Sequence, residues 1–431
     1  MKRVLIISYY WPPTGGSGVQ RWVKMCKYLP GEDWQCVVCT PDNPERLATD
    51  ASLLRDIPPE TEVLRLPIRE PYAAYRRLTG RGSGKGAGIN PINAQRKSLI
   101  QKILLFLRAN LFIPDPRRGW VGPAERFLRS YLKEHPVDAL VTTGPPHSMH
   151  LVGLRLHRAL GIPWVADFRD PWTKMFYFKH LPLLPWARRS QERLEQAVLD
   201  EASAVVAVSP RVQADFQART RTQVELITNG FDEDDFAAPA PSPDGKFRIV
   251  HAGLFASDGN PLVFWDVLAR KCAEDPAFRQ SLSLVLAGKV DPEITEALEA
   301  RGLGPFLSLP GYLPHSASVQ ALVSADLLLL PLRQDPEYAK VLPGKIFEYL
   351  AARRPVLGIG QEDSAAGDLL WACGAGQMAD WNREDAMRAF LDRAWAAFLA
   401  GEKSPVSSDI DAYSRRRLAG RMAELLNQIS A

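Results

Sequence analysis

The sequence is poor in features that mark secreted and membrane proteins. Its 431 residues include five cysteines, Cys26, Cys36, Cys39, Cys272 and Cys373. An odd, scattered set does not suggest a disulfide framework and is more typical of a reducing compartment. No apolar run reaches the roughly 18 residues that span a bilayer, and the apolar stretch after the N-terminus is too short for a secretory signal. We therefore expect a globular protein that works in the cytoplasm.

Redox, metal and dinucleotide motifs are missing too. Cys36 and Cys39 have C-x-x-C spacing, but in their apolar run they would point to opposite faces of a strand. The acidic run from Asp232 to Asp235 follows a turn, so we interpret it as helix capping or a solvated surface. The N-terminal glycines lack G-x-G-x-x-G spacing. The sequence therefore predicts no metal site and no cofactor.

Positive charge is concentrated in one segment. The formal net charge is +4, but Pro71 to Trp120 holds ten Lys or Arg against one acid, Asp115, which gives +9. Within it, Ser98 to Phe112 predicts a helix with a broad apolar face flanked by cations. Such a helix is typical of a surface that binds anionic lipid, and the alternative is a core helix with a solvated basic face. Nucleic acid is a weaker candidate, because no aromatic stacking pattern accompanies the charge.

Short apolar segments alternate with helical patterns in two series, which predicts two α/β domains. A proline-rich linker, Ala237 to Gly245, separates them. Strands are expected at residues 4–8, 35–40, 62–66, 139–143, 164–167, 204–209 and 224–227, then at 247–252, 283–287, 307–309, 326–332 and 356–359. The predicted domains are 1–240, which includes the basic segment 71–120, and 241–405. Residues 406–431, with a helix from Ala412 to Ile429, are expected to cross back to the N-terminal domain.

The segment from Val341 to Leu357 is the most informative about function. Pro343 and Gly344 suit the entry to a helix, Lys345 suits a phosphate oxygen, and Glu348 suits a ribose diol. In a parallel sheet, ligands bind beyond the carboxyl ends of the strands. The alternative is an ordinary exposed Lys and Glu pair on an amphipathic helix.

Three polar loops follow apolar strands in the N-terminal half. The first holds Gly15, Gly16 and Gly18, which would let backbone N–H groups approach a ligand. The second ends in His147, and the third runs from Asp167 to Trp172. His147 or Asp170 would orient an acceptor hydroxyl, and the alternative for Arg169 between Asp167 and Asp170 is a closed structural ion network.

Four motifs in order resemble the retaining GT-B glycosyltransferases, particularly family four. They are Tyr9 to Pro13 with its glycine loop, Ile227 to Asp232, Gly311 to Pro314, and Lys345 to Leu357. The resemblance implies two doubly wound, Rossmann-like domains that face each other across a cleft. It also implies a nucleotide-sugar donor held mainly by the C-terminal domain, an acceptor on the N-terminal domain, and metal-independent transfer with retention at the anomeric carbon.

Two positions depart from the family pattern. Glu348 matches the second Glu of the family's Glu, seven residues, Glu motif, but Lys340 stands where the first is expected. The Arg and Lys pair that often follows Gly253 is missing too, and Lys289 and Arg333 are the nearest substitutes. The resemblance and the loops together give candidate catalytic residues His147, Arg169, Asp170 and Lys345, and acceptor-binding residues Asp167 and Trp172. The candidate donor-binding residues are Gly15, Gly16, Gly18, Gly253, Lys289, Gly311, Tyr312, Leu313, Arg333, Pro343, Gly344 and Glu348.

The expected activity is transfer of a sugar to a lipid-linked saccharide in bacterial surface polysaccharide synthesis. The partners would be a nucleotide-sugar donor, a saccharide or lipid-linked saccharide acceptor, and an anionic membrane surface, with no nucleic acid. The protein would be cytoplasmic or peripheral on the inner face of the cytoplasmic membrane. Two alternatives remain, a sugar-nucleotide 2-epimerase of the same architecture and a non-catalytic assembly protein that binds a sugar nucleotide.

Overall fold

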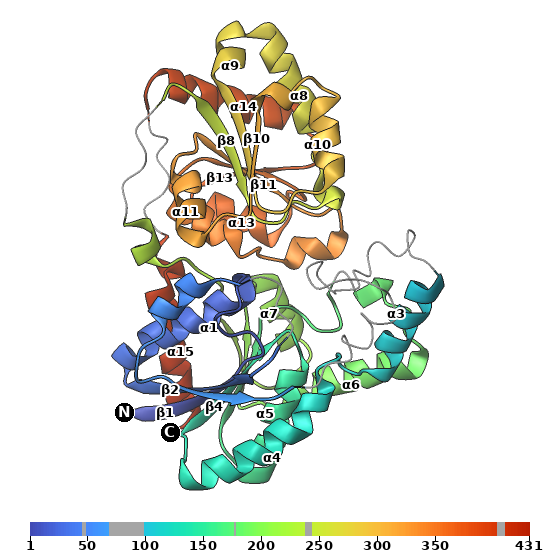
Figure 1. The fold of residues 1–431 in the computed structure, drawn as a ribbon, viewed down its shortest axis with the longest axis vertical. Helices are drawn as coiled ribbons and strands as arrows, with labels where there is room; N and C mark the ends of the chain where they lie inside the picture. Colours follow the sequence, from blue (N-terminus) through green and yellow to red (C-terminus); the bar gives the residue numbers. More distant parts are fainter. Residues whose placement is uncertain (45–48, 69–98, 176–177, 238–243, 403–409) are drawn as a thin grey trace. The chain divides into compact units, whose positions relative to one another are not determined.

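The computed structural model describes residues 1–44, 49–68, 99–175, 178–237, 244–402 and 410–431 (Figure 1). These residues form two compact units. The first contains Met1–Thr228 and Leu418–Ala431, and the second contains Asn229–Arg417. Each unit is built around one parallel sheet.

The sheet of the first unit has seven strands in the order β3-β2-β1-β4-β5-β6-β7. They are β1 (Lys2–Ile7), β2 (Trp34–Pro41), β3 (Glu62–Leu66), β4 (Ala139–Gly144), β5 (Trp164–Phe168), β6 (Ala204–Ala207) and β7 (Val224–Leu226). The central strands are short apolar runs because helices cover both faces of a parallel sheet. The strand order reverses between β1 and β4, which is where doubly wound folds bind ligands.

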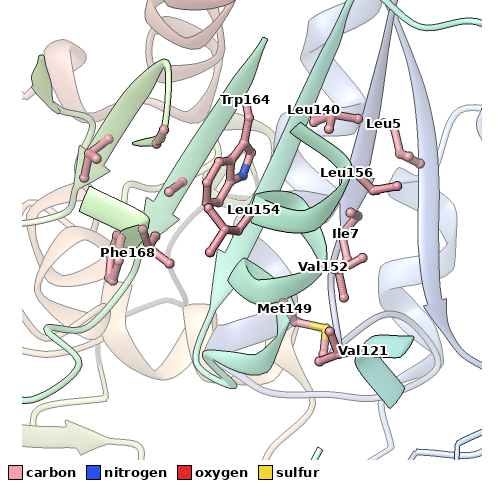
Figure 2. Packing of buried hydrophobic residues seen from close by; sticks show 14 of the residues in the cluster. Leu5, Ile7, Val121, Leu140, Met149, Val152, Leu154, Leu156, Trp164 and Phe168 are labelled. Carbon is pink, nitrogen blue, oxygen red and sulfur yellow. The ribbon is translucent and has the colours of Figure 1, made fainter. Parts of the chain in front are cut away.

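Helices cover both faces of this sheet. They are α1 (Ser17–Tyr28), α4 (Arg118–Glu134), α5 (Ser148–Leu160), α6 (Pro185–Glu201) and α7 (Pro210–Gln217), with short 3₁₀ helices η1 (Leu29–Glu32), η2 (Ala51–Asp56) and η4 (Phe178–His180). A further helix, α3 (Leu99–Leu111), contributes no residue to either core of this sheet. On one face, Met149 and Val152 of α5 belong to a core with Ile7 of β1, as Figure 2 shows. Both α6 and α7 begin with proline, whose fixed φ suits the first helical turn.

The second unit has a six-stranded sheet in the order β10-β9-β8-β11-β12-β13. Its strands are β8 (Phe247–Ala252), β9 (Leu282–Ala287), β10 (Leu307–Gly311), β11 (Leu327–Pro331), β12 (Val356–Ile359) and β13 (Gly376–Ala379). Its helices are α8 (Leu262–Glu274), α9 (Pro276–Ser281), α10 (Pro292–Glu299), α11 (His315–Val323), α12 (Lys345–Ala351), α13 (Ala365–Ala372) and α14 (Glu384–Leu399), with η5 (Glu233–Phe236), η6 (Ser257–Gly259), η7 (Gly304–Phe306), η8 (Pro336–Lys340) and η9 (Asp411–Tyr413). Here the order reverses between β8 and β11.

The last helix, α15 (Arg415–Ile429), belongs to both units. Its first residues are part of the second unit, and from Leu418 onward it packs into the first. Leu418, Met422 and Leu426 are buried in a core that also contains Val4 and Trp22. The division between the units falls after Thr228, whereas the sequence predicted a domain boundary at residue 240.

All twelve predicted strands are present, with ends that differ by a few residues. The thirteenth, β13, was not predicted. The C-terminal helix begins at Arg415 and was predicted from Ala412. Most of the predicted linker (238–243), and the part of the basic segment at residues 71–98, lie outside the described residues. Within the described ranges, no helix is long and apolar enough to cross a bilayer.

Candidate functional site

Lys345 of the second unit lies beside the carboxyl end of β8, at the point where the strand order reverses. Its Nζ is 3.2 Å from His251 Nε2 and 3.3 Å from the carbonyl oxygen of Leu254. His251 is fully buried, and its Nδ1 is 3.0 Å from the carbonyl oxygen of Leu329. Because a carbonyl oxygen only accepts, we assign the proton to Nδ1, which leaves Nε2 to accept from the Lys345 ammonium.

The charges agree with this assignment. Burial, and then the nearby Lys345, hold the pKa of His251 well below its usual value, so the ring is neutral. Burial also lowers the pKa of Lys345 to about 8, against the opposing effect of Glu348. Lys345 is therefore a cation at neutral pH. Two acceptors fix its ammonium and leave one of three N–H donors for a ligand.

Glu348 lies nearly one helical turn beyond Lys345 on α12. Within the described residues its carboxylate has no hydrogen bond, and His315 Nδ1 lies 3.9 Å from Oε1. His315 Nε2 is in turn 3.1 Å from Asp235 Oδ2. Burial raises the pKa of Glu348, and His315 and Arg415 oppose that rise. The carboxylate can therefore accept hydrogen bonds from a ligand.

Glycine is needed where β8 and β9 end. Gly253 has a φ of 110°, and a Cβ there would lie 3.0 Å from Lys345 Nζ. Gly288 has a φ of 114°, and its Cβ would meet the Gly253 carbonyl oxygen at 2.3 Å. Its amide donates to the carbonyl oxygen of Gly311, the last residue of β10, at 2.7 Å. The backbone after three neighbouring strands is thus fixed beside Lys345.

The other donor-site candidates of the second unit lie in the segments after β9, β10 and β11 and before α12. Tyr312 is 63% exposed and Leu313 is partly buried after β10, while Pro343 and Gly344 are partly buried before α12. Lys289 is exposed. Arg333 forms an ion pair with Asp258, and Lys340 forms one with Glu337 at 3.0 Å. The structure therefore brings Gly253, Lys345 and Glu348 together, and it gives Arg333 a counter-ion of its own.

In the first unit, Asp167 lies inside a closed network. Its two oxygens accept from Arg21 Nε and Nη2 at 3.0 and 2.8 Å, from Trp22 Nε1 at 2.8 Å and from Thr143 Oγ1 at 2.9 Å. Arg21 also donates to the carbonyl oxygens of Ile227 and Thr228. Both charged side chains are fully buried. The direct ion-pair partner of Asp167 is therefore Arg21. Arg169, which the sequence placed between Asp167 and Asp170, is coupled to both: burial lowers its pKa, and the charges of Asp170 and Asp167 oppose that change.

Arg169 instead connects two of the predicted loops. Its Nη1 donates to the Gly18 carbonyl oxygen at 2.8 Å, and its other nitrogens donate to the carbonyl oxygens of Gly144 and Pro145. A Cβ at Gly18 would lie 2.6 Å from Nη1, and one at Gly15 would lie 2.9 Å from Asp50 Cβ. These two glycines thus make room for side chains of their own unit, while Gly16 is the N-cap of α1. Burial raises the pKa of Asp170 to about 6, although Arg169 opposes it.

His147 follows β4 and stacks on Trp172, with ring centroids 4.7 Å apart and an interplanar angle of 3°. It is 6% exposed, and neither ring nitrogen has a hydrogen-bond partner among the described residues. Burial, then His150 and Arg169, keep the pKa of His147 well below its usual value. The structure therefore places a neutral imidazole beside a predicted acceptor-binding residue, with its hydrogen-bonding capacity unused.

The surface of α3 is strongly apolar. The helix is held by Asn110, whose Nδ2 donates to the carbonyl oxygen of Pro182 and whose Oδ1 accepts from the Leu184 amide, both at 2.8 Å. Exposed apolar side chains lie along α3 and at the start of α6: Leu99, Ile103, Phe106, Leu107, Leu111, Leu184 and Trp186. Lys102 is exposed on the same helix. The predicted apolar face of this helix is therefore largely in solvent.

No group of three or more His, Cys, Asp or Glu that could hold a metal ion occurs in the part of the chain that the structure describes. In the acidic run, the Asp232 side chain caps η5 by accepting from the Asp234 amide at 3.2 Å, as predicted. Sequence reasoning missed Arg21, His251 and His315. The sequence held two signals for them: Arg21 is a charged residue on the apolar face of α1, and His251 is a histidine inside the apolar strand β8.

Comparison with known proteins identifies the fold and the class of enzyme. Residues 94–235 match the sequence profile of Glycosyltransferase Family 4. The chain is a glycosyltransferase of the GT-B type. The match falls mostly in the first unit, which carries His147 and Arg169. No curated protein matches this glycosyltransferase in sequence.

Solved structures share the fold over the full length. Sucrose-phosphate synthase from Thermosynechococcus elongatus has a TM-score of 0.64 at 14% identity, and the alignment covers 100% of this chain and 99% of the synthase chain. WaaG, a glycosyltransferase involved in lipopolysaccharide biosynthesis, has a TM-score of 0.53 at 13% identity, and the alignment covers 99% of this chain and 95% of the WaaG chain. HepE from Anabaena, in complex with UDP-glucose, has a TM-score of 0.56 at 14% identity, and the alignment covers 100% of this chain and 97% of the HepE chain. At this identity the likeness establishes the two-unit α/β fold.

Proposed function

We propose that this glycosyltransferase takes a nucleotide sugar as its donor and that the second unit holds the nucleotide. The observation that carries the proposal is the pair of Lys345 and Glu348. Lys345 offers a fixed cation with one open donor, and Glu348 offers a carboxylate with no hydrogen bond within the described residues. A diphosphate needs a cation such as Lys345, and a ribose diol needs a hydrogen-bond acceptor such as the Glu348 carboxylate. HepE, which shares the fold, was solved with UDP-glucose.

The proposed reaction retains the configuration at the anomeric carbon and needs no metal. The bond between that carbon and the diphosphate oxygen breaks, the acceptor oxygen bonds to the carbon on the same face, and the acceptor proton passes to the leaving phosphate. Negative charge grows on the diphosphate, and a fixed ammonium stabilises such charge. Lys345 supplies that cation in our proposal. This stereochemistry rests on the resemblance to the retaining family.

The proposed acceptor is a lipid-linked saccharide of a bacterial surface polysaccharide, and the proposed location is the inner face of the cytoplasmic membrane. Seven exposed apolar side chains on α3 and the start of α6 support it, because such a surface buries favourably at the headgroup boundary. The net charge of +9 in residues 71–120 favours an anionic lipid surface. The fold is shared with WaaG, which is involved in lipopolysaccharide biosynthesis.

The test begins with thermal shifts of the full-length protein in UDP-, GDP-, ADP- and TDP-sugars. One nucleotide class should raise the melting temperature, and Glu348→Gln should reduce that shift. The selected donor is then incubated with lipid-linked acceptors, and the product is identified by mass spectrometry and by NMR of the new linkage. Release of an epimerised free sugar would support the epimerase instead. Binding without turnover would support the assembly protein.

A further inference from the structure

Two side chains of α12 bind two successive residues of β8. The first is Lys345, whose Nζ lies 3.2 Å from His251 Nε2 and 3.3 Å from the carbonyl oxygen of Leu254. The second is Tyr349, whose hydroxyl accepts a hydrogen bond from the Ala252 amide at 2.9 Å. Residues four positions apart lie on one face of a helix. The fold therefore holds the Lys345 side chain against the end of β8.

His251 offers Lys345 a single acceptor in a fixed place. The imidazole is fully buried, and its Nδ1 donates to the carbonyl oxygen of Leu329 at 3.0 Å. A neutral imidazole has one N–H donor and one acceptor nitrogen. The Phe255 ring packs beside it, with the two ring centroids 4.6 Å apart. Because Nδ1 holds the proton, the lone pair of Nε2 faces the Lys345 ammonium.

Only Lys345 changes its charge in this pair near neutral pH. Burial, and then Lys345, keep the pKa of His251 well below its usual value, so the ring stays neutral. Burial lowers the pKa of Lys345 to about 8, and Glu348 on the same helix opposes that change. The charged groups that act on Glu348 from other elements are His315, Arg415 and Asp235. A hydrogen bond that the ammonium donates favours its charged form, so His251 helps Lys345 to keep its proton.

We propose that His251 is a positioning residue for the donor diphosphate. It is fully buried, so it acts through Lys345 and does not touch the ligand. Two N–H groups of the ammonium bind His251 and the Leu254 carbonyl oxygen, which fixes the direction of the third before the donor arrives and reduces the ordering cost of binding. A carboxylate in the place of the imidazole would neutralise the ammonium, whereas a neutral acceptor leaves its full charge for the phosphate. The identity of the ligand rests on the proposed function, and the contact between His251 and Lys345 does not.

Two substitutions of His251 separate this role from packing. Gln keeps an acceptor oxygen near the position of Nε2 and loses the ring, whereas Phe keeps a ring and loses the acceptor. The probe is whichever of UDP, GDP, ADP and TDP raises the melting temperature of the full-length protein most. Its affinity is measured by calorimetry, and the titration of Lys345 is followed by carbon NMR of the lysine side chains, with the signal assigned by its loss in Lys345→Arg.

His251→Phe should weaken diphosphate binding about fivefold at pH 7 and lower the midpoint of the Lys345 titration by about one pH unit, since the ammonium loses a hydrogen bond. His251→Gln should bind within about twofold of the unchanged protein and keep its midpoint. Tighter binding by His251→Phe than by His251→Gln would show a packing role and overturn the proposal.

A double-variant cycle tests whether His251 acts through Lys345. Lys345→Met removes the ammonium, and in that background His251→Phe should change the diphosphate affinity by less than about twofold. An equal loss in both backgrounds would mean that His251 acts without Lys345, and the proposal would be wrong.

The matched control is Tyr349→Phe on the same helix. It removes the hydroxyl that binds the Ala252 amide and should lower the melting temperature, while the midpoint of the Lys345 titration stays in place. If Tyr349→Phe moves that midpoint as far as His251→Phe does, the packing of α12 on β8 positions Lys345 and the proposal fails.

The tautomer of His251 provides a test that needs no folded variant. Nitrogen NMR of the histidine rings in the unchanged protein should show the His251 proton on Nδ1 near neutral pH, and a proton on Nε2 would refute the contact. If none of the four diphosphates binds, the proposed function fails together with the donor role of His251, while the tautomer and the Lys345 titration still decide the contact. If one binds and His251→Phe changes neither its affinity nor the titration, this proposal alone fails.

Discussion

Replacement of Asp167 by Asn should strongly destabilise this glycosyltransferase. The carboxylate accepts four hydrogen bonds, two from Arg21, one from Trp22 and one from Thr143, and it is fully buried. Asn keeps one oxygen and replaces the other by an NH₂ group. That group would face a donor wherever it is placed, and the fully buried Arg21 guanidinium would lose its counter-ion.

The expected cost follows from this geometry. Removal of one partner from a buried ion pair costs about 3–5 kcal/mol, because the remaining charge is left uncompensated. Arg21 keeps its bonds to the carbonyl oxygens of Ile227 and Thr228, so the lower half of that range, about 3–4 kcal/mol, is expected. The matched control is Glu201→Gln. This substitution breaks the ion pair of Glu201 with Arg158, whose side chains are 35% and 55% exposed, respectively. Loss of such an exposed pair costs at most about 1 kcal/mol.

The measurement is urea unfolding of both variants, followed by circular dichroism. A double variant, Arg21→Met with Asp167→Leu, should recover part of the loss, because it removes both charges from the interior. If Asp167→Asn is as stable as Glu201→Gln but binds acceptor poorly, the closed network is not structural and Asp167 contacts the acceptor directly. That result would refute the reasoning.

Four further outcomes are expected. Glu348→Gln should weaken UDP binding by ~1.5–3 kcal/mol in calorimetry, since a charge-assisted hydrogen bond is lost. The control Glu384→Gln on α14 should not weaken it, and equal UDP affinities of the two variants would contradict the ribose role of Glu348. Because the pKa of Lys345 is lowered to about 8, its ammonium loses its proton as pH rises, so UDP affinity should fall by up to about tenfold between pH 7 and pH 9, and a flat profile would argue against a phosphate contact. Lys345→Arg should abolish this pH dependence. Transfer activity should persist in excess EDTA, and its loss with recovery on addition of Mn²⁺ or Mg²⁺ would show a metal requirement. Vesicles with anionic lipid should bind the protein, release it as salt rises, and bind Ile103→Asp less well, while equal binding to neutral vesicles would refute electrostatic attraction to the membrane.

The sequence predicted those parts of the fold in which local pattern and tertiary structure agree. Strands such as β8 and β12 are short apolar runs with β-branched residues, and their bounds were predicted correctly. Strand β13 was missed because Gly376 to Ala379 contains no β-branched or aromatic residue. It forms because β12 offers a parallel edge for pairing. Tertiary context decides such a segment.

The candidate site was predictable only where its residues are near in sequence. Lys345 and Glu348 lie on one helix, so their spacing was enough to pair them. The contacts of Lys345 with His251 and of Asp167 with Arg21 join residues 94 and 146 positions apart, and no local pattern encodes such a distance. The same holds for Arg169 and Gly18, whose contact required both the strand order and the loop conformation.

The placement of α15 has a consequence for synthesis of the chain. The strands of the first unit are complete at β7, but Leu418, Met422 and Leu426 cover part of its core. About 190 residues separate Thr228 from Leu418. At a translation rate of roughly 5–20 residues per second, the ribosome needs about 10–40 s to reach α15 after the strands are made. During that interval the part of this core that α15 covers, beside Val4 and Trp22, stays exposed, so the nascent chain should depend on a chaperone while the second unit is being synthesised.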